Sequence, residues 1–341
     1  WYEGNKRDLP WRRTKDPYCI WISEIILLQT RVDQGLNYYL RFLEKFPDIE
    51  TLALAEEEDV MKAWQGLGYY SRARNLHESA KTIYNEHDAV FPSSYEEIRQ
   101  LKGIGDYSAS AISSIAYGEP HPVIDGNVLR LVARFAGITE PVKSTVGTKK
   151  VRAFLDEHFD RDLPGVFNQA AMEMGAMVCK PRQPLCDQCP LNDLCYALKH
   201  DQVNILPVMN KPNKPQVRYL NYLVILSGDG PGRSLWMRKR TGEDIWKNLY
   251  DFPVVEADRE LSPEEIRKSE EWEKITGNLS LHIVQEKILA PYLLSHRELR
   301  VKFFIVESSD YFHQNFIKVP LSDIYNYPVP RLIENILKIV T

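Results

Sequence analysis

The sequence predicts a multidomain protein, with an all-α domain in its first 200 residues and a smaller α+β domain after it. Three observations support this fold class. Apolar residues recur at intervals of three and four from about residue 17 to 200, a proline-rich stretch follows, and short segments rich in β-branched and aromatic residues come last. With 341 residues and 44% hydrophobic composition, the chain is long enough to build two separate cores.

The elements follow from local patterns. In the first part, apolar periodicity indicates helices at 21–28, 59–64 and 128–133. Residues 207–217 hold three prolines and two lysines, which is typical of an extended, solvated linker. Beyond it we expect strands at 219–226, 234–240, 249–255 and 298–306, and helices at 263–275 and 329–340. The predicted boundaries are 1–200 for the first domain, 201–216 for the linker and 217–341 for the second domain.

Composition excludes several protein classes. No apolar run approaches the ~20 residues that cross a bilayer, and Trp1 opens a segment without the basic-then-apolar pattern of a signal peptide. We therefore expect no membrane association and a cytoplasmic, nucleoid-associated protein if the source is bacterial, with an N-terminal targeting segment left open. The net charge of −4 gives no bulk electrostatic signature of nucleic-acid binding, so any DNA contact must come from locally placed groups.

Four of the five cysteines fall within a short segment, as Cys179-x6-Cys186-x2-Cys189-x5-Cys195. Four thiolates can hold either a tetrahedral zinc ion or a [4Fe–4S] cluster. Structural zinc sites usually pair two short Cys-x2-Cys knuckles, whereas this segment contains one, so we predict the cluster, with zinc as the alternative. The fifth, Cys19, stands among apolar neighbours and is predicted to be a small buried side chain.

Residues 95–112 predict two short helices, at 95–101 and 106–112, joined by a turn that contains Gly103 and Gly105. Glycine lets bare backbone approach a ligand, and the free N–H groups at the start of the second helix suit a phosphate. We therefore expect contacts with a DNA backbone at these two glycines. The alternative is a plain turn between packed helices.

Two carboxylates are placed for chemistry at a sugar carbon. Glu24 lies within an apolar helical run, where burial would raise its pKa and let it act as a general acid; the alternative is an exposed glutamate. Asp125 directly precedes a predicted helix, and its alternative role is an ordinary N-cap. Cleavage of a glycosidic bond needs one acid and one anion of unequal pKa, so the pair fits that reaction.

Together these motifs resemble the helix-hairpin-helix DNA glycosylases, and within them the MutY-type adenine glycosylases of the endonuclease III-like superfamily. The resemblance rests on the hairpin at 101–105, the aspartate at 125 and the cysteine spacing, and it extends to segments 9–12, 21–30 and 66–72. It covers nearly the whole chain, more strongly before residue 200.

The resemblance implies that adenine paired with 8-oxoguanine or guanine in double-stranded DNA is flipped out of the helix and excised in base excision repair. Glu24 would protonate N7 of adenine, Asp125 would stabilise the cationic sugar, and water would complete the hydrolysis. Asn127 would orient Asp125. Further residues expected near the substrate are Trp11, Arg12 and Gln169 around adenine, and Gln29, Thr30, Leu67 and Tyr69 at the base stack.

Relatives that also cut the DNA backbone carry a lysine four residues beyond the first hairpin glycine, where its amine can form a Schiff base with the sugar. Here that position is Tyr107, so the resemblance implies a monofunctional glycosylase. It also implies a monovalent cation at the hairpin. We expect the protein to act as a monomer.

The C-terminal part resembles the Nudix-like domain that recognises 8-oxoguanine in this family. Ser295 and His296 match the serine and histidine of a Phe-Ser-His loop, in which the serine contacts the lesion; the alternative is a polar turn between strands. Leu294 departs from the phenylalanine of that loop, and Leu28 stands where the family commonly has glutamine.

Three other functions fit these residues less well. A Nudix-type nucleotide hydrolase needs glutamates clustered on one helix to hold Mg²⁺, and the helix at 263–272 lacks that arrangement. A non-catalytic lesion reader would not need both Glu24 and Asp125. A bifunctional pyrimidine glycosylase/lyase of the endonuclease III type would not need the long C-terminal domain.

Overall fold

The computed structural model describes residues 1–210, 215–277, 281–294, 297–308 and 313–341. By its internal contacts the chain divides into two compact units. The first contains residues 1–54 and 75–211, and the second contains residues 55–74 and 212–341. By its contacts, the segment 55–74 therefore belongs to the same unit as the C-terminal residues. The predicted domain boundaries remain predictions.

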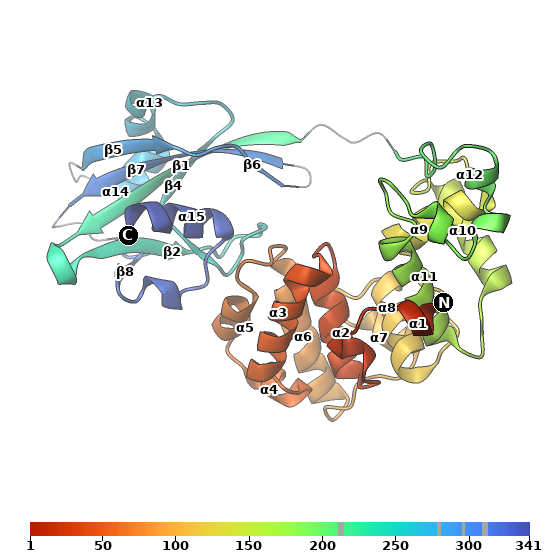
Figure 1. Ribbon diagram of the computed structural model, residues 1–341. Helices are drawn as coiled ribbons and strands as arrows, with labels where there is room; N and C mark the ends of the chain where they lie inside the picture. Colours follow the sequence, from red (N-terminus) through yellow and green to blue (C-terminus); the bar gives the residue numbers. More distant parts are fainter. Residues whose placement is uncertain (211–214, 278–280, 295–296, 309–312) are drawn as a thin grey trace. The chain divides into compact units, whose positions relative to one another are not determined.

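The described part of the first unit is entirely helical, which confirms the all-α prediction. Figure 1 shows its helices in red to green, in the order α1 (Tyr2–Asn5), η1 (Pro10–Arg12), α2 (Pro17–Leu27), α3 (Val32–Lys45), α4 (Ile49–Leu54), α6 (Ser71–Glu86, which begins in the second unit), α7 (Tyr95–Gln100), α8 (Asp106–Ile112), η2 (Ser113–Tyr117), α9 (Gly126–Ala136), α10 (Thr145–His158), α11 (Pro164–Met177), η3 (Cys186–Gln188), η4 (Asn192–Leu194) and α12 (Tyr196–Lys199). None of the described helices is long and apolar enough to cross a membrane.

Local sequence explains where these helices begin and end. Asp16 caps α2 by accepting a hydrogen bond from the Tyr18 N–H, and Pro17 occupies the first helical position. Asp125 caps the start of α9, and Gly137 caps its end in a left-handed conformation at φ +70°. Its apolar stripe packs against α10 and α11, so that one small core fixes the start of α9.

The second unit contains a mixed sheet in the order β3-β2-β1-β7-β5, with β1 and β7 paired in parallel at its centre. The C-terminal strands are β1 (Gln216–Ser227), β2 (Ser234–Lys239), β3 (Tyr250–Asp251), β4 (Val254–Ala257), β5 (His282–Ile288), β6 (Tyr292–Leu293), β7 (Arg297–Glu307) and β8 (Ile317–Pro320). Its helices are α5 (Glu57–Trp64), η5 (Gly230–Gly232), α13 (Pro263–Arg267), α14 (Glu270–Thr276), η6 (Ile324–Asn326) and α15 (Arg331–Val340). Figure 1 shows α15 lying across the sheet.

Several predicted elements need correction. The proline-rich stretch 207–217 was expected to be extended and solvated to its end, but β1 already begins at Gln216, where it pairs with Arg297 of β7. The strand expected at 249–255 is two strands, because Pro253 between them has no N–H to donate. The helix expected at 263–275 is two helices, since Ser269 caps a new helix by accepting from the Trp272 N–H. Cys19 is half-buried rather than buried, and its thiol donates to Asp16.

Candidate active site

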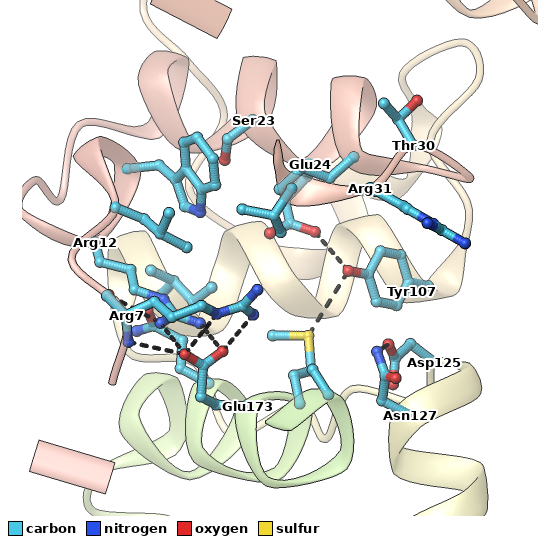
Figure 2. A pocket seen from close by; sticks show the side chains of 18 of the residues that line it. Arg7, Arg12, Ser23, Glu24, Thr30, Arg31, Tyr107, Asp125, Asn127 and Glu173 are labelled. Atoms are coloured by element: carbon cyan, nitrogen blue, oxygen red, sulfur yellow. Dashed lines mark hydrogen bonds and ion pairs between the residues drawn. The ribbon is translucent and has the colours of Figure 1, made fainter. Parts of the chain in front are cut away.

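A cavity of about 510 Å³ opens in the first unit between α2, α8, α9 and α11, and it is large enough to admit a nucleobase. Figure 2 shows that Glu24, Tyr107 and Asp125 point into it from three different helices. Residues remote in sequence therefore meet at one site. Trp11, Arg12, Thr30, Asn127 and Gln169, all predicted near the substrate, also line this cavity.

Glu24 is the buried acid that the sequence predicted. Glu24 is only 6% exposed, because α2 is apolar on nearly every face and lies in the interior. Burial raises the pKa of Glu24 to about 7; a hydrogen bond from Tyr107 lowers it, and the negative charge of Asp125 raises it. The Tyr107 hydroxyl donates to Glu24 Oε2 at 2.7 Å. Near neutral pH a large fraction of Glu24 is therefore protonated and able to donate.

Asp125 is both an N-cap and a cavity residue. Its Oδ1 accepts from the Val128 N–H at 2.7 Å, and its Oδ2 accepts from Asn127 Nδ2 at 2.7 Å. Burial raises the pKa of Asp125, although these hydrogen bonds act in the opposite direction. The amide of Asn127 thus contacts the carboxylate that the resemblance expects it to orient.

The other wall of the cavity holds an ion-pair cluster that sequence reasoning missed. Glu173 of α11 has a fully buried carboxylate, which accepts from Arg7 and Arg12 at distances of 2.6–2.9 Å (Figure 2). Burial alone would raise the pKa of Glu173, but the hydrogen bonds from Arg12 and Arg7 lower it to about 2. The signal was the one used for Glu24, a lone glutamate within an apolar helical run.

The residues expected at the base stack lie on two different units. Gln29 of the first unit is exposed and has a positive φ of 61°. Leu67 and Tyr69 line a cavity of about 910 Å³ in the second unit, and Tyr69 has a φ of 48°. Positive φ values at two non-glycine residues mark loops held in uncommon conformations. Ser295 and His296 lie outside the described residues.

The hairpin glycines differ in their surroundings. Gly103 has φ +80°, and a Cβ there would lie 2.6 Å from the Cβ of Asn75, so only glycine fits. Gly105 is the N-cap of α8, and open space surrounds the position of its absent side chain. The backbone at Gly105 is therefore accessible to a ligand such as phosphate.

All four clustered cysteines line one apolar cavity beside α9, and none of the five cysteines, all of which the structure describes, forms a disulfide. A single zinc ion needs its ligands converging at about 2.3 Å. Among the described residues, no group of three His, Cys, Asp or Glu side chains converges closely enough to hold one metal ion. The four cysteines around this cavity supply the all-thiolate set of ligands that an iron–sulfur cluster uses.

Two arginines of α9, which sequence reasoning also missed, hold the start of the cysteine segment through hydrogen bonds. Arg130 Nε donates to the Cys179 carbonyl at 2.7 Å, and its Nη2 donates to Asn127 Oδ1 at 3.0 Å. Arg134 Nη1 donates to the Cys179 Sγ at 3.4 Å and to the Lys180 carbonyl at 2.8 Å. Both arginines are buried, although charged residues on a helix are usually exposed, so their sequence pattern alone did not single them out.

Family models match three parts of the chain. Residues 22–156 match the model of the HhH-GPD superfamily base excision DNA repair proteins, residues 179–195 match the iron–sulfur binding domain of endonuclease III, and residues 221–338 match the NUDIX domain. Among solved structures, a thermostable thymine-DNA glycosylase is similar with a TM-score of 0.54 and 27% identity, covering 58% of this chain and 92% of that one. The fold and the cavity thus define a helix-hairpin-helix DNA-repair glycosylase with an iron–sulfur domain and a NUDIX domain.

Curated relatives narrow the family further. The adenine DNA glycosylase of Buchnera aphidicola subsp. Acyrthosiphon pisum is 31% identical over 345 residues, which cover 99% of this chain and 95% of that protein. The Homo sapiens adenine DNA glycosylase is 41% identical over 227 residues, which cover 64% of this chain but only 42% of the human protein. The chain belongs to the adenine DNA glycosylase family of base excision repair, which confirms the predicted family and fold class.

Proposed function

We propose that this protein hydrolyses the N-glycosidic bond of adenine mispaired with 8-oxoguanine or guanine in double-stranded DNA. One observation supports this most strongly: Glu24, with a pKa of about 7, and Asp125 line the same cavity, which is large enough to admit a base. The lower ordinary pKa of Asp125 and its hydrogen bonds with Val128 and Asn127 favour its anion, whereas burial favours the neutral acid at Glu24. An acid and an anion in one cavity are what glycosidic cleavage requires.

The reaction begins when adenine is flipped into the cavity, where it meets Trp11 and Gln169. Glu24 then donates its proton to N7, so that the base leaves as neutral adenine. The bond between C1′ and the base breaks with its electron pair going to adenine. Asp125 stabilises the positive charge that develops on the sugar, and water adds at C1′ with loss of a proton.

We propose that the enzyme does not cut the DNA backbone. Strand cleavage through a Schiff base needs an amine at the sugar, and Tyr107 occupies the position of that amine in bifunctional relatives. None of the described residues that line the cavity is a lysine. The Tyr107 hydroxyl is instead hydrogen-bonded to Glu24.

We propose that Cys179, Cys186, Cys189 and Cys195 hold a [4Fe–4S] cluster. When bound, such a cluster ties its four thiolates into one rigid loop. Arg134 donates a hydrogen bond to one of the thiolate sulfurs, and its guanidinium would offset part of their negative charge. Iron and acid-labile sulfide measured on the purified protein should each come to about four per chain, whereas zinc in their place would contradict this assignment.

Recognition of 8-oxoguanine is assigned to the second unit. Its cavity of about 910 Å³ is lined by Leu67, Tyr69 and Leu294. Leu294 directly precedes Ser295 in the sequence. Arg74, Arg218, Arg297 and Arg331 also line this cavity, and arginines suit the phosphates of a DNA strand. We also propose that the protein acts as a monomer and that a monovalent cation binds at the hairpin. If the source is bacterial, we propose a cytoplasmic location.

A glycosylase assay on mispaired duplexes tests the proposal. Adenine should be released from A:8-oxoguanine and A:G duplexes much faster than from A:T, and strands should break only after alkaline treatment. Equal rates on A:8-oxoguanine and A:T would contradict the substrate, and strand breaks without alkali would contradict monofunctionality. A Tyr107→Lys variant tests the position itself, since an amine there should introduce strand cleavage.

A further inference from the structure

Within the second unit, a short C-terminal segment is held by hydrogen bonds on two sides. We call this set of hydrogen bonds the grip. We call residues Tyr327, Pro328 and Val329 the strap. The Val329 N–H donates to Gln65 Oε1 at 3.4 Å, and the Val329 carbonyl accepts from the Tyr70 hydroxyl at 3.3 Å. Val329 is 2% exposed and Tyr70 is 3% exposed, so water cannot replace these hydrogen bonds.

Two further contacts complete the grip. Lys62 Nζ donates to the Tyr327 carbonyl at 3.2 Å and to Gln65 Oε1 at 2.9 Å. On the other side, the Tyr250 N–H of the sheet donates to the Pro328 carbonyl at 2.9 Å. The strap therefore connects the sheet to the segment that contains Lys62, Gln65 and Tyr70.

Gln65 and Tyr70 stand at the two ends of the loop that presents Tyr69. Inside this loop Gly66, Gly68 and Tyr69 all have positive φ values, of 96°, 73° and 48°. For Tyr69 such a conformation is uncommon and persists only when its surroundings hold it. The strap contacts both residues that bracket the strained loop.

A second set of contacts holds the loop from within its own segment. Trp64 Nε1 and Arg72 Nη2 both donate to the Gly68 carbonyl, at 3.2 Å and 3.3 Å. The Arg72 guanidinium also lies over the Tyr69 ring, 5.5 Å from its centroid. Tyr69 nevertheless remains 45% exposed, so its ring is available to a DNA stack.

We propose that the strap positions the Tyr69 loop for base flipping, with Gln65 and Tyr70 as the positioning residues. This inference rests on the proposed function. It assigns the C-terminal unit a second task that is independent of the lesion: it holds the loop that enters the stack opposite the flipped adenine. Loss of the grip should therefore impair flipping for every mispair, whereas loss of a lesion contact should impair only A:8-oxoguanine.

The variants test this grip directly. Gln65→Met keeps the side-chain size but removes the acceptor, Gln65→Glu keeps an acceptor, and Tyr70→Phe removes one hydroxyl. Tyr325→Phe is the matched control, because its hydroxyl contacts only Thr341 among the described side chains and lies outside the loop. Flipping is followed by the fluorescence of 2-aminopurine placed at the adenine position, and excision is followed in single turnovers on A:8-oxoguanine and A:G duplexes.

Gln65→Met and Tyr70→Phe should each lower the flipped fraction and slow excision by about tenfold, and by the same factor on both duplexes. Gln65→Glu and Tyr325→Phe should behave as wild type. A normal flipped fraction, or slowing confined to A:8-oxoguanine, would overturn the inference. Its failure is separate from that of the proposed function, because wild-type protein that released no adenine would contradict the function while fluorescence still reported the flipping.

Discussion

The Tyr107 hydroxyl and the Glu24 carboxyl form a hydrogen bond of 2.7 Å at the centre of the active-site cavity. Two opposing effects meet in this pair. Burial disfavours the glutamate anion, whereas the tyrosine proton stabilises it, and the balance leaves the pKa of Glu24 at about 7. Tyr107 also stands where bifunctional relatives carry their amine. In the proposed mechanism the same side chain therefore takes the place of the amine and adjusts the pKa of the acid.

The rate of excision should depend on pH through both carboxylates. Glu24 must be protonated to donate, so the rate should fall as the pH rises through about 7. Asp125 must be ionised, so the rate should also fall in acid, at a pH above the ordinary value of 3.8 because burial raises its pKa. Single-turnover rates across pH measure this profile, and a rate that kept rising above pH 8 would show that Glu24 is not the acid.

The Tyr107→Phe variant should move the alkaline limb of that profile upward. The lost hydrogen bond favours the glutamate anion, so its removal raises the pKa of Glu24 further. The acid limb, set by Asp125, should stay in place. Single-turnover pH profiles of the two proteins make the comparison, and an alkaline limb that moved downward would contradict the assigned direction.

The Glu24→Gln variant should be inactive yet more stable than wild type at pH 8. The unfolded chain loses the Glu24 proton near 4.5 and the folded protein near 7. Between these values the folded state holds more protons, so the free energy of unfolding falls as the pH rises and then levels off. The neutral amide avoids this loss, worth about 3 kcal/mol by pH 8. Urea denaturation of both proteins at pH 5 and pH 8 tests this prediction. If the free energies of unfolding of variant and wild type differed by the same amount at both pH values, Glu24 would not be a buried acid.

The Glu173→Ala variant should destabilise the first unit by about 3–5 kcal/mol, because Arg7 and Arg12 lose a buried partner. The pKa of Glu173 is lowered to about 2, so its contribution is complete above the ordinary value of 4.5 and is lost as the pH falls through about 2. Thermal unfolding measures the change. Glu3→Gln, at the exposed ion pair with Lys6, is the control and should have no measurable effect.

Some of the site could be predicted because single residues carried the signal. Glu24 stood out as a charged residue in an apolar helix, and the structure shows that it is buried rather than exposed. Asp125 stood out because it precedes a helix, and it does cap α9 while also lining the cavity. Glu173 carried the same signal as Glu24 and could have been found. It was overlooked because its two arginine partners lie about 160 residues away.

Other features have no signature in the sequence. The grip on the strap uses the backbone N–H and carbonyl of Val329, which every residue except proline possesses. Likewise, the split of the expected helix at 263–275 depends on Ser269 acting as a cap rather than continuing the helix. Such choices are decided by packing, so the segment 55–74 could not be assigned to the second unit from its sequence.

The position of Asp125 at the start of α9 has one more consequence. The aligned peptide dipoles of a helix place a partial positive charge at its N-terminus, about half an elementary charge. That is an unfavourable neighbour for a sugar that becomes a cation. The Asp125 carboxylate accepts a hydrogen bond from the Val128 N–H at this helix end, so its negative charge offsets the dipole there. A neutral residue such as the asparagine of Asp125→Asn would therefore keep the cap and leave the sugar facing an uncompensated dipole.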